Sequence, residues 1–455
     1  MSRFVIIDKK FWAWVGVATF VALIVGILSC ALTSHVSLDG DVIQGGDASY
    51  YHNGANLLVD GRGFIMPFEY FYSGKSVQAA DHPPLYMTYL AAFSLFGLRS
   101  VGSHQTATIL LAVAAVPFVA CAGRRMAGRV AGVLAAFIAA GHPGIWSWGK
   151  ILMSESMAIL CVAILVATAL RVRARVVEGT STKWDVVALG LAISMAALAR
   201  AELLICGAII GFVCFLGRPV WPTFKKVVAT GIVALIPMAP WIGYNLSRFN
   251  QPVFLSDGAG VTFSATNCDS TYNGPRVGSW SFECSVRRSK QAHKANPDGD
   301  RSDSMKFIGD IGRDYIKDHL SDQPRVLGFR LARAFGFYRF ESQINADKFS
   351  DGRGNMVSRG AWYTYYGLLP LAVLGSLISR RKNRSLPIVM IPLITAIITV
   401  AITFGSTRYR AIAEVAFVLL GAAGIDFLVR KLRHTEESSP IPPLGQLEAS
   451  ARGGT

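Results

Sequence analysis

Residues 105–146 are QTATILLAVAAVPFVACAGRRMAGRVAGVLAAFIAAGHPGIW, two apolar runs separated by Arg124, Arg125 and Arg129. A helix needs about 20 apolar residues to cross roughly 30 Å of hydrocarbon. Comparable runs recur along the chain, in which 52% of the 455 residues are hydrophobic and 16% are charged. The sequence therefore predicts an all-α polytopic membrane protein.

Ten apolar runs are predicted to cross the membrane. They cover residues 12–33, 105–122, 130–146, 156–170, 184–199, 203–216, 227–244, 362–378, 386–404 and 411–429. Five basic clusters then lie on the same side as the N-terminus: Arg124/Arg125/Arg129, Arg171/Arg173/Arg175/Lys183, Arg218/Lys225/Lys226, Arg380/Arg381/Lys382/Arg384 and Arg430/Lys431/Arg433. Because cytoplasmic loops carry an excess of Lys and Arg, we expect a multi-pass protein of the plasma membrane with both termini in the cytoplasm.

The apolar segment 84–97 is too short for an ordinary span. If it crossed the membrane, every later basic cluster would lie outside, so it is predicted to lie in the outer interface. The net charge of +16 does not indicate nucleic-acid binding, because the basic residues form no single face or tract. The lipid bilayer is therefore the expected partner of these basic residues, and a nucleic-acid partner is not expected.

The predicted spans divide the chain into four parts. Residues 1–244 form an N-terminal transmembrane module with a first outer loop at 34–104, and 245–361 form a second extracytoplasmic loop with amphipathic helices. Residues 362–430 are C-terminal transmembrane helices, and 431–455 are a disordered cytoplasmic tail. Cys268 and Cys284 share the second outer loop, where an oxidising exterior favours a disulfide without requiring one.

Ionisable side chains gather at the outer ends of the predicted spans. A proton or ion relay normally places such residues at mid-membrane depth, and no internal repeat typical of many transporters is visible. The pattern therefore favours a site at the outer rim. Its candidates are Asp47, Asp81, His82, Lys150, Glu155, Arg200, Glu202, Arg408 and Arg410.

Several of these residues lie in short motifs that occur in a characteristic order. The motifs are Gly46-Asp47-Ala48-Ser49-Tyr50, His82-Pro83-Pro84-Leu85-Tyr86, Met153-Ser154-Glu155, Ala197-Leu198-Ala199-Arg200 and Gly405-Ser406-Thr407-Arg408-Tyr409-Arg410. From residue 12 to 430 the chain resembles the GT-C membrane glycosyltransferases, in particular the branch similar to protein O-mannosyltransferases and aminoarabinose transferases. The resemblance implies an inverting glycosyltransferase that moves a hexose or pentose from a polyprenyl-phosphate donor to an extracytoplasmic acceptor, which is a cell-envelope glycan, a lipid or a protein.

The resemblance assigns the catalytic base to an acidic residue of the first outer loop, which here is Asp47. Ala48 stands where many relatives carry a second acidic residue, so Asp39 and Asp41 remain alternative bases or auxiliary charges. No cofactor is implied with certainty. A divalent metal near these three aspartates stays open.

The donor phosphate is predicted to contact Arg200, Arg408, Arg410 and His82. A guanidinium matches a phosphate with two hydrogen bonds, although each arginine could instead be a snorkelling membrane anchor. His82 could instead cap the helix that begins at Pro84. Glu155 is predicted to orient the acceptor or to neutralise an arginine, Tyr409 to pack against the sugar or the lipid, and Tyr50 to be an auxiliary residue of the acceptor site.

Two other classes of function are compatible with the same residues. A transporter or flippase of a lipid-linked or acidic solute could use the outer arginines as a gate. A non-catalytic scaffold could bind cell-wall polymers through its long outer loop. Replacing Asp47 by Asn should stop an enzyme and leave a transporter nearly unaffected.

Overall fold

The computed structural model describes residues 8–32, 38–39, 42–43, 46–216, 220–382 and 385–433. Each of the ten predicted spans overlaps one helix over most of its length. These helices are α1 (Lys9–Leu32), α5 (Val101–Ala127), α6 (Arg129–Gly141), α8 (Glu155–Val177), α9 (Lys183–Ala199), α10 (Leu203–Phe215), α11 (Val220–Arg248), α18 (Asn355–Lys382), α19 (Leu386–Ile402) and α21 (Glu414–Arg433). Within the described ranges the only strands are β1 (Leu38–Asp39) and β2 (Val42–Ile43), which pair antiparallel. The all-α polytopic membrane class is confirmed.

Among the described residues, six helical segments are long and apolar enough to cross a membrane, and α6, α10 and α19 are shorter apolar helices. The predicted span 130–146 is interrupted, because α6 ends at Gly141 and the short α7 (Pro143–Trp146) follows. His142 is extended, with φ −76° and ψ 112°. A residue before proline disfavours the helical conformation, which explains the break.

Close packing of the membrane helices depends on small residues. α8 is the most deeply buried of the six long apolar segments. α18 packs along α21 where a Cβ atom added to Gly375 would lie 2.0 Å from the Leu420 carbonyl oxygen. A Cβ atom added to Gly424 would lie 2.2 Å from the Leu371 carbonyl oxygen. Glycine therefore lets these two backbones approach each other as membrane helices commonly do.

The first outer loop contributes α2 (Gly46–Val59), α3 (Pro67–Ser73) and α4 (Leu85–Leu95). The 11 residues of α4 cover only about 16 Å, too little to cross a bilayer. Leu95 and Phe96, at its C-terminal end, are strongly exposed. The segment 84–97 is therefore a short non-spanning helix, as predicted.

The second outer loop is a set of short helices. They are α12 (Ala259–Thr266), α13 (Asp269–Tyr272), η1 (Gly274–Arg276), α14 (Phe282–Ala295), α15 (Arg301–Asp318), η2 (Leu320–Asp322), α16 (Gln323–Ala334) and α17 (Phe340–Asp351). Cys268 and Cys284 form a disulfide that joins the start of α13 to α14. The favoured pairing of these two cysteines is thus confirmed.

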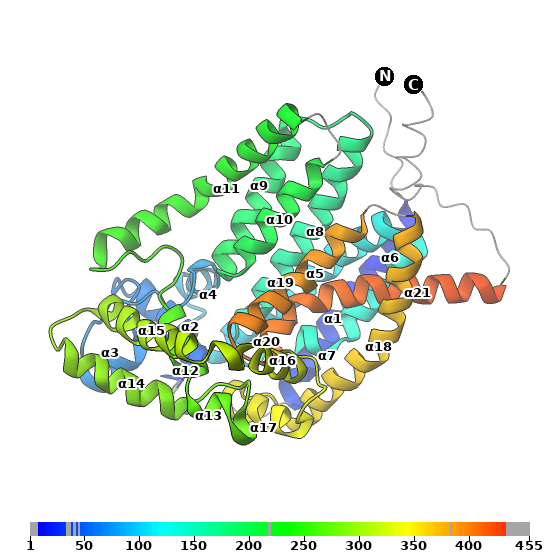
Figure 1. Cartoon of the computed structure of the whole chain (residues 1–455). Helices are drawn as coiled ribbons and strands as arrows, with labels where there is room; N and C mark the ends of the chain where they lie inside the picture. The colour runs from blue at the N-terminus through cyan, green and yellow to red at the C-terminus, as the bar shows by residue number, and fades with distance from the viewer. Residues whose placement is uncertain are drawn as a thin grey trace.

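The two outer loops lie against each other at one end of the helix bundle (Figure 1). Arg248, at the end of α11, donates hydrogen bonds of 2.8 Å to the carbonyl oxygens of Phe64 and Ala79. The amide of Asp257 donates to the Ala80 carbonyl at 2.8 Å. These bonds fix the second outer loop against the segment that precedes α4.

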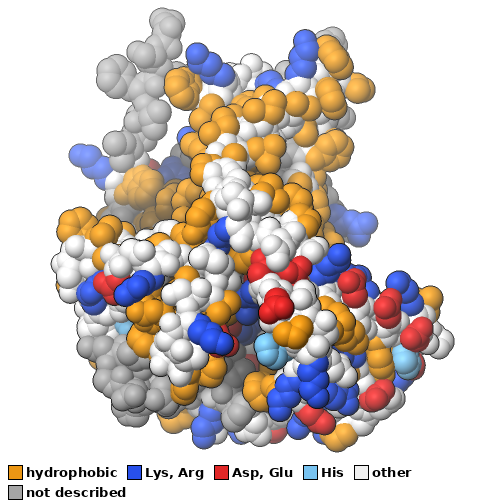
Figure 2. Space-filling view, turned by 90° about the vertical axis from the view of Figure 1, so that its left-hand side faces the viewer, with side chains coloured by type: hydrophobic (Ala, Val, Ile, Leu, Met, Phe, Trp, Pro, Cys, Tyr) orange, Lys and Arg blue, Asp and Glu red, His pale blue; other side chains and the backbone are white. Residues whose placement is uncertain are grey.

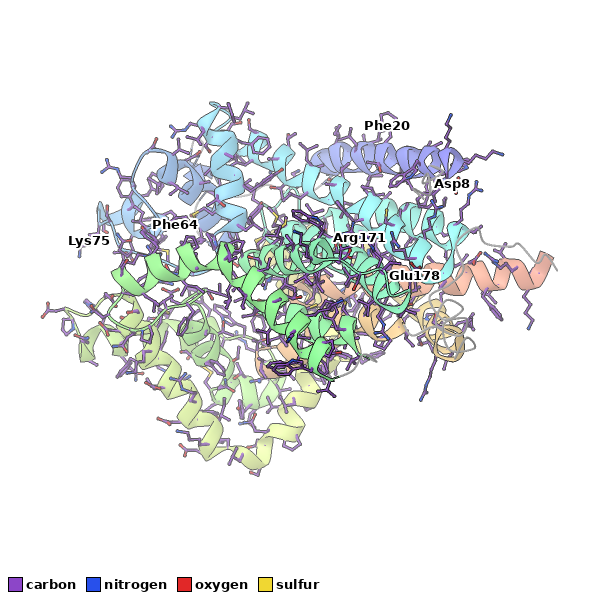
Figure 3. All side chains as sticks on the ribbon, turned by 90° about the horizontal axis from the view of Figure 1, so that it is seen from above. Asp8, Phe20, Phe64, Lys75, Arg171 and Glu178 are labelled. Carbon is purple, nitrogen blue, oxygen red and sulfur yellow. A yellow bond between two sulfur atoms is a disulfide. The ribbon has the colours of Figure 1, made fainter. Side chains whose placement is uncertain are left out.

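The basic loops lie at the other end of the bundle. Asp8 pairs with Arg124 at 3.4 Å, and Lys226 donates to the hydroxyl of Ser181 at 2.5 Å. Figure 3 shows Asp8 toward the same side as Arg171 and Glu178, with Phe64 and Lys75 toward the opposite side. Figure 2 shows hydrophobic side chains over the upper part of one face, with Lys and Arg at its top edge and mixed charges over its lower part. An apolar zone between two charged ends is the arrangement of a multi-pass membrane protein.

Candidate functional site

Arg408 lies at the centre of a chain of ion pairs. Its Nη2 atom is 2.6 Å from Oδ2 of Asp47, and its Nε atom is 2.8 Å from Oε1 of Glu155. Nη1 of Arg200 contacts the same Glu155 oxygen at 2.7 Å, and Nε of Arg200 lies 2.5 Å from Oε1 of Glu202. Four sequence-predicted residues, Asp47, Glu155, Arg200 and Arg408, are thus brought together from the ends of two membrane helices, α8 and α9, and from two outer segments, α2 and α20.

Local structure positions each of these side chains. Gly46 has φ +71°, a conformation that favours glycine, and it places Asp47 in the first turn of α2. A carboxylate there is stabilised by the positive end of the helix dipole. Arg200 caps the C-terminus of α9 in an extended conformation. Arg408 lies in the short helix α20 (Thr407–Arg410), whose N-cap hydroxyl, from Ser406, accepts the Arg408 amide at 3.3 Å.

Burial is deepest in the middle of the ion-pair chain, because Arg200 is 10% exposed and Glu202, at the other end, is 20% exposed. The side chain of Asp47 is 32% exposed and that of Arg408 is 18% exposed, whereas Glu155 is fully buried. Asp47 is therefore the most exposed member of the cluster, and Arg408 lies beside it. A ligand would reach this pair before it reached Glu155.

Asp47 is held in its ionised form. Burial opposes ionisation, but the charge of Arg408 and the contact with His82 outweigh it and keep the pKa of Asp47 well below its usual value. The carboxylate can accept a proton or a hydrogen bond at neutral pH, yet it is a weak base while Arg408 holds it.

His82 adjoins the more exposed end of the cluster. Its Nε2 atom lies 3.5 Å from Oδ2 of Asp47. The imidazole stacks on Tyr51 with 5.1 Å between ring centroids and meets Tyr50 edge-on at 5.5 Å. Asp81 turns away and pairs with Arg301 of α15. The structure therefore brings His82 and Tyr50 to Asp47.

Tyr409 lies beside Arg200, whose guanidinium carbon is 5.6 Å from the centre of the Tyr409 ring. Arg410 does not join this cluster. Its Nε atom pairs with Glu414 at 3.0 Å, and its guanidinium lies 4.2 Å from the Trp362 ring and 4.0 Å from the Tyr365 ring. The expected convergence of three arginines is thus wrong for Arg410, because it points into a separate buried cluster.

The two alternative bases, Asp39 and Asp41, precede α2 in the chain. Asp41 lies outside the described residues, and Asp39 is described only by its backbone in β1. Within the ranges given above, no group of three or more His, Cys, Asp or Glu side chains is arranged to hold a metal ion. The possible metal near Asp39, Asp41 and Asp47 therefore stays a prediction.

Three contacts of the cluster were not expected from the sequence. Ser154 accepts a hydrogen bond of 3.4 Å from Nη1 of Arg200, and Tyr51 supports His82. Glu202, noted in the sequence only as an outer charge, completes the ion-pair chain. The sequence did carry a signal for this contact, because Glu202 follows Arg200 by two residues. Side chains two residues apart can meet where the backbone is extended at the end of a helix, as it is at Arg200.

Known proteins match this chain by structure. Neither protein-family models nor curated protein sequences give a match. The oligosaccharyltransferase of Archaeoglobus fulgidus, tethered with an acceptor peptide containing the NVT sequon, superposes with a TM-score of 0.58 at 15% identity, over 98% of this chain and 53% of that one. The same organism's oligosaccharyltransferase AglB, in complex with an inhibitory peptide and a dolichol-phosphate, gives a TM-score of 0.57 at 15% identity, over 98% and 54%.

The aminoarabinose transferase ArnT of Cupriavidus metallidurans, bound to undecaprenyl phosphate, gives a TM-score of 0.42 at 15% identity, over 94% of this chain and 82% of that one. The fold comparison rests on the archaeal structures alone, and the chain spans about half their length. Their similarity covers the described membrane helices and both outer loops. The chain therefore has the fold of the GT-C membrane glycosyltransferases, which its motifs resemble.

Proposed function

We propose that this protein is an inverting glycosyltransferase that moves a hexose or pentose from a polyprenyl-phosphate donor to an acceptor at the membrane surface. The observation that carries the proposal is the position of Arg408 between Asp47 and Glu155, at 2.6 and 2.8 Å. A proton acceptor and a phosphate-binding cation are thereby held side by side at the more exposed end of the cluster. The GT-C fold, and the dolichol-phosphate in the structure of the archaeal oligosaccharyltransferase AglB, support the donor class.

Asp47 would act as the general base. A hydroxyl of the acceptor donates its proton to Asp47 while its oxygen bonds to the anomeric carbon from the face opposite the phosphate. The bond between the anomeric carbon and the phosphate oxygen breaks, and its electron pair leaves with the lipid phosphate. One such displacement inverts the anomeric centre.

Arg408 would couple donor binding to the strength of that base. A donor phosphate competes with Asp47 for the guanidinium, which offers several donors in a planar fork. As Arg408 turns toward phosphate, Asp47 loses the main charge that lowers its pKa and becomes a better proton acceptor. The same cation stabilises the charge that develops on the departing phosphate.

The neighbouring residues would complete the site. Arg200 and His82 are proposed to contact the donor phosphate, and Tyr50, Tyr409 and Glu155 to orient sugar or acceptor. Arg410 is not included, because Glu414 holds it elsewhere. Asp41 keeps its predicted auxiliary role, since its surroundings lie outside the described residues.

The proposed orientation places both termini in the cytoplasm and the site on the other side of the plasma membrane. It is supported by the separation of the basic loops from the outer loops in the fold (Figure 3). The prenyl chain of the donor would remain in the bilayer, where each buried methylene contributes about 0.8 kcal/mol. The lipid would then not leave the membrane to react.

Replacing Asp47 by Asn tests the proposal. Purified protein in liposomes is given a panel of radiolabelled polyprenyl-phosphate sugars, and transfer and donor binding are measured separately. We expect Asp47→Asn to lower turnover about 10²- to 10⁴-fold while donor binding is retained, because only proton acceptance is lost. Asp60→Asn, which changes an exposed carboxylate in the turn after α2, is the matched control.

Normal turnover by Asp47→Asn would contradict the assignment of the base. If the wild-type protein moved the intact lipid-linked sugar between leaflets without cleaving it, the alternative function of a flippase would replace the enzyme.

A further inference from the structure

The segment that carries Arg408 is held from its far side by a buried polar network. The hydroxyl of Thr407 donates to Oδ1 of Asp347 at 2.8 Å. Arg353 donates to the same hydroxyl and pairs with Asp347 at 2.8 Å. All three residues are less than 5% exposed. The residue before Arg408, Thr407, is therefore held by two hydrogen bonds of its hydroxyl group.

The other members of this network come from the end of the second outer loop. Gln343 on α17 donates to Oδ1 of Asp347 at 3.1 Å. The guanidinium of Arg353 lies 4.1 Å from the centre of the Trp148 ring. The end of the second outer loop thus contacts both Trp148, which precedes α8, and Thr407 of α20.

The residues on the other flanks of Arg408 are fixed as well. Arg410 pairs with Glu414 and donates to the Ala334 carbonyl at 3.2 Å. The amide of Gly405 donates to the Gly278 carbonyl at 2.8 Å. A Cβ atom added to Gly405 would lie 2.5 Å from the Arg330 carbonyl oxygen, so the backbone is pressed against the outer loop.

A small cavity lies between the group of Asp347, Arg353 and Thr407 and the ion pair of Arg410 with Glu414. Its volume is about 10 Å³, and Thr407, Arg410, Trp362, Ser358 and Glu414 are among the residues that line it. Nε1 of Trp362 and Oγ of Ser358 are buried and have no hydrogen-bond partner among the described residues. Oε2 of Glu414 is buried and likewise makes no hydrogen bond, although it lies 3.4 Å from Nε2 of His142. A volume of this size holds one water molecule, and such a water normally has two to four polar partners.

We propose that Asp347, Arg353 and Thr407 are positioning residues that fix Arg408 toward Asp47 and Glu155, and that one internal water completes this clamp. A long arginine side chain loses rotamer freedom when it binds a ligand, and a fixed backbone directs it before the ligand arrives. The inference rests on the proposed function, in which Arg408 binds the donor phosphate. It adds that the second outer loop controls that residue without touching the substrate.

The internal water is tested by a high-resolution cryo-EM map of the full chain in nanodiscs. Density within hydrogen-bond reach of Trp362 Nε1, Ser358 Oγ and Glu414 Oε2 is expected. A well-resolved cavity without such density would overturn this part of the proposal.

The clamp is tested by a double-mutant cycle with undecaprenyl phosphate as the probe. Thr407→Val removes the hydroxyl at nearly constant volume, Thr407→Ser keeps it, and Arg408→Gln removes the guanidinium. We expect Thr407→Val to weaken binding about tenfold in the wild-type background and to have no effect in the Arg408→Gln background, because Thr407 acts through Arg408. Thr407→Ser and the exposed-surface control Glu341→Gln, on α17, should bind within about twofold of wild type.

A second readout separates failure of the clamp from failure of the proposed function. Infrared titration of Asp47, identified by subtraction of the Asp47→Asn spectrum, should show a higher pKa in Thr407→Val, because Arg408 is no longer held against the carboxylate. If Arg408→Gln leaves binding unchanged but Thr407→Val still raises that pKa, the phosphate role fails and the clamp stands. An unchanged pKa, or additive effects of Thr407→Val and Arg408→Gln on binding, would overturn the clamp.

Discussion

Glu155→Gln is expected to make the protein less stable while making it bind an anion more tightly. Glu155 is fully buried, and one of its oxygens accepts from both Arg200 and Arg408, at 2.7 and 2.8 Å. Glutamine keeps the shape and an accepting oxygen but removes the charge. The two guanidinium groups then lose a shared counter-ion and become more available to a phosphate.

The size of each effect follows from these contacts. A hydrogen bond to a charged group contributes about 1.5–3 kcal/mol and a neutral one about 0.5–1.5 kcal/mol, so two weakened bonds lower the free energy of unfolding by about 2–3 kcal/mol. If a bound phosphate lay roughly 10 Å from the Glu155 carboxylate, the two charges would repel by about 1.7 kcal/mol at an effective dielectric constant of about 20. Relief of that repulsion predicts roughly tenfold tighter binding.

Two measurements on the same purified sample test whether Glu155→Gln lowers stability while it strengthens anion binding. Equilibrium unfolding in mixed micelles gives the loss of stability, and titration with undecaprenyl phosphate gives the dissociation constant. If binding weakened in step with stability, or did not change, Arg200 and Arg408 would be structural ion-pair partners and the reasoning about a phosphate site would be refuted.

Three further outcomes are expected. Replacing both Cys268 and Cys284, which are 16 residues apart, by Ser should cost about 3 kcal/mol of unfolding free energy, and the difference from wild type should vanish in reductant. Gly424→Ala should cost about 1–3 kcal/mol in the same assay because its Cβ would meet the Leu371 carbonyl at 2.2 Å, whereas Gly16→Ala, with nothing within 4 Å, should cost little. The pKa of Asp47 is lower in the folded state than in the unfolded state, where it is about 3.9, so its stabilising contribution is present above that pH and is lost as the pH falls through the folded value. The profile of kcat/KM against pH should therefore show no acidic limb from Asp47 above about pH 4, and a limb at higher pH that disappears in Asp47→Asn would contradict the ion pair.

The membrane helices could be predicted because length and hydropathy act locally. Each predicted span overlaps a helix over most of its length, and the one interruption, at His142, was marked in the sequence by the proline that follows it. The meeting of Asp47 with Arg408 was anticipated only through the order of the family motifs. Composition alone would have left both residues as charges at the outer rim.

Arg410 shows why the prediction of a third converging arginine failed. No helix was predicted at residues 407–410, although the structure forms α20 there. Residues two apart on a helix do not face each other, so Arg408 and Arg410 point to different sides. The hydrogen bond between Thr407 and Asp347 was missed for another reason, because these residues are 60 positions apart and neither carries a local signal of the contact.

The distance in sequence between Asp47 and Arg408, 361 residues, has a consequence for biosynthesis. At about 5–20 residues per second, the ribosome needs roughly 20–70 s to add Arg408 after Asp47 has been made. Glu155 and Arg200 are 45 residues apart, so their ion pair can form early in synthesis. The ion pair of Asp47 can form only after Arg408 has been made. A nascent or truncated chain that ends before α20 would thus lack the ion pair of Asp47 with Arg408. Under the proposed function, such a chain would be inactive until the last helices had been added.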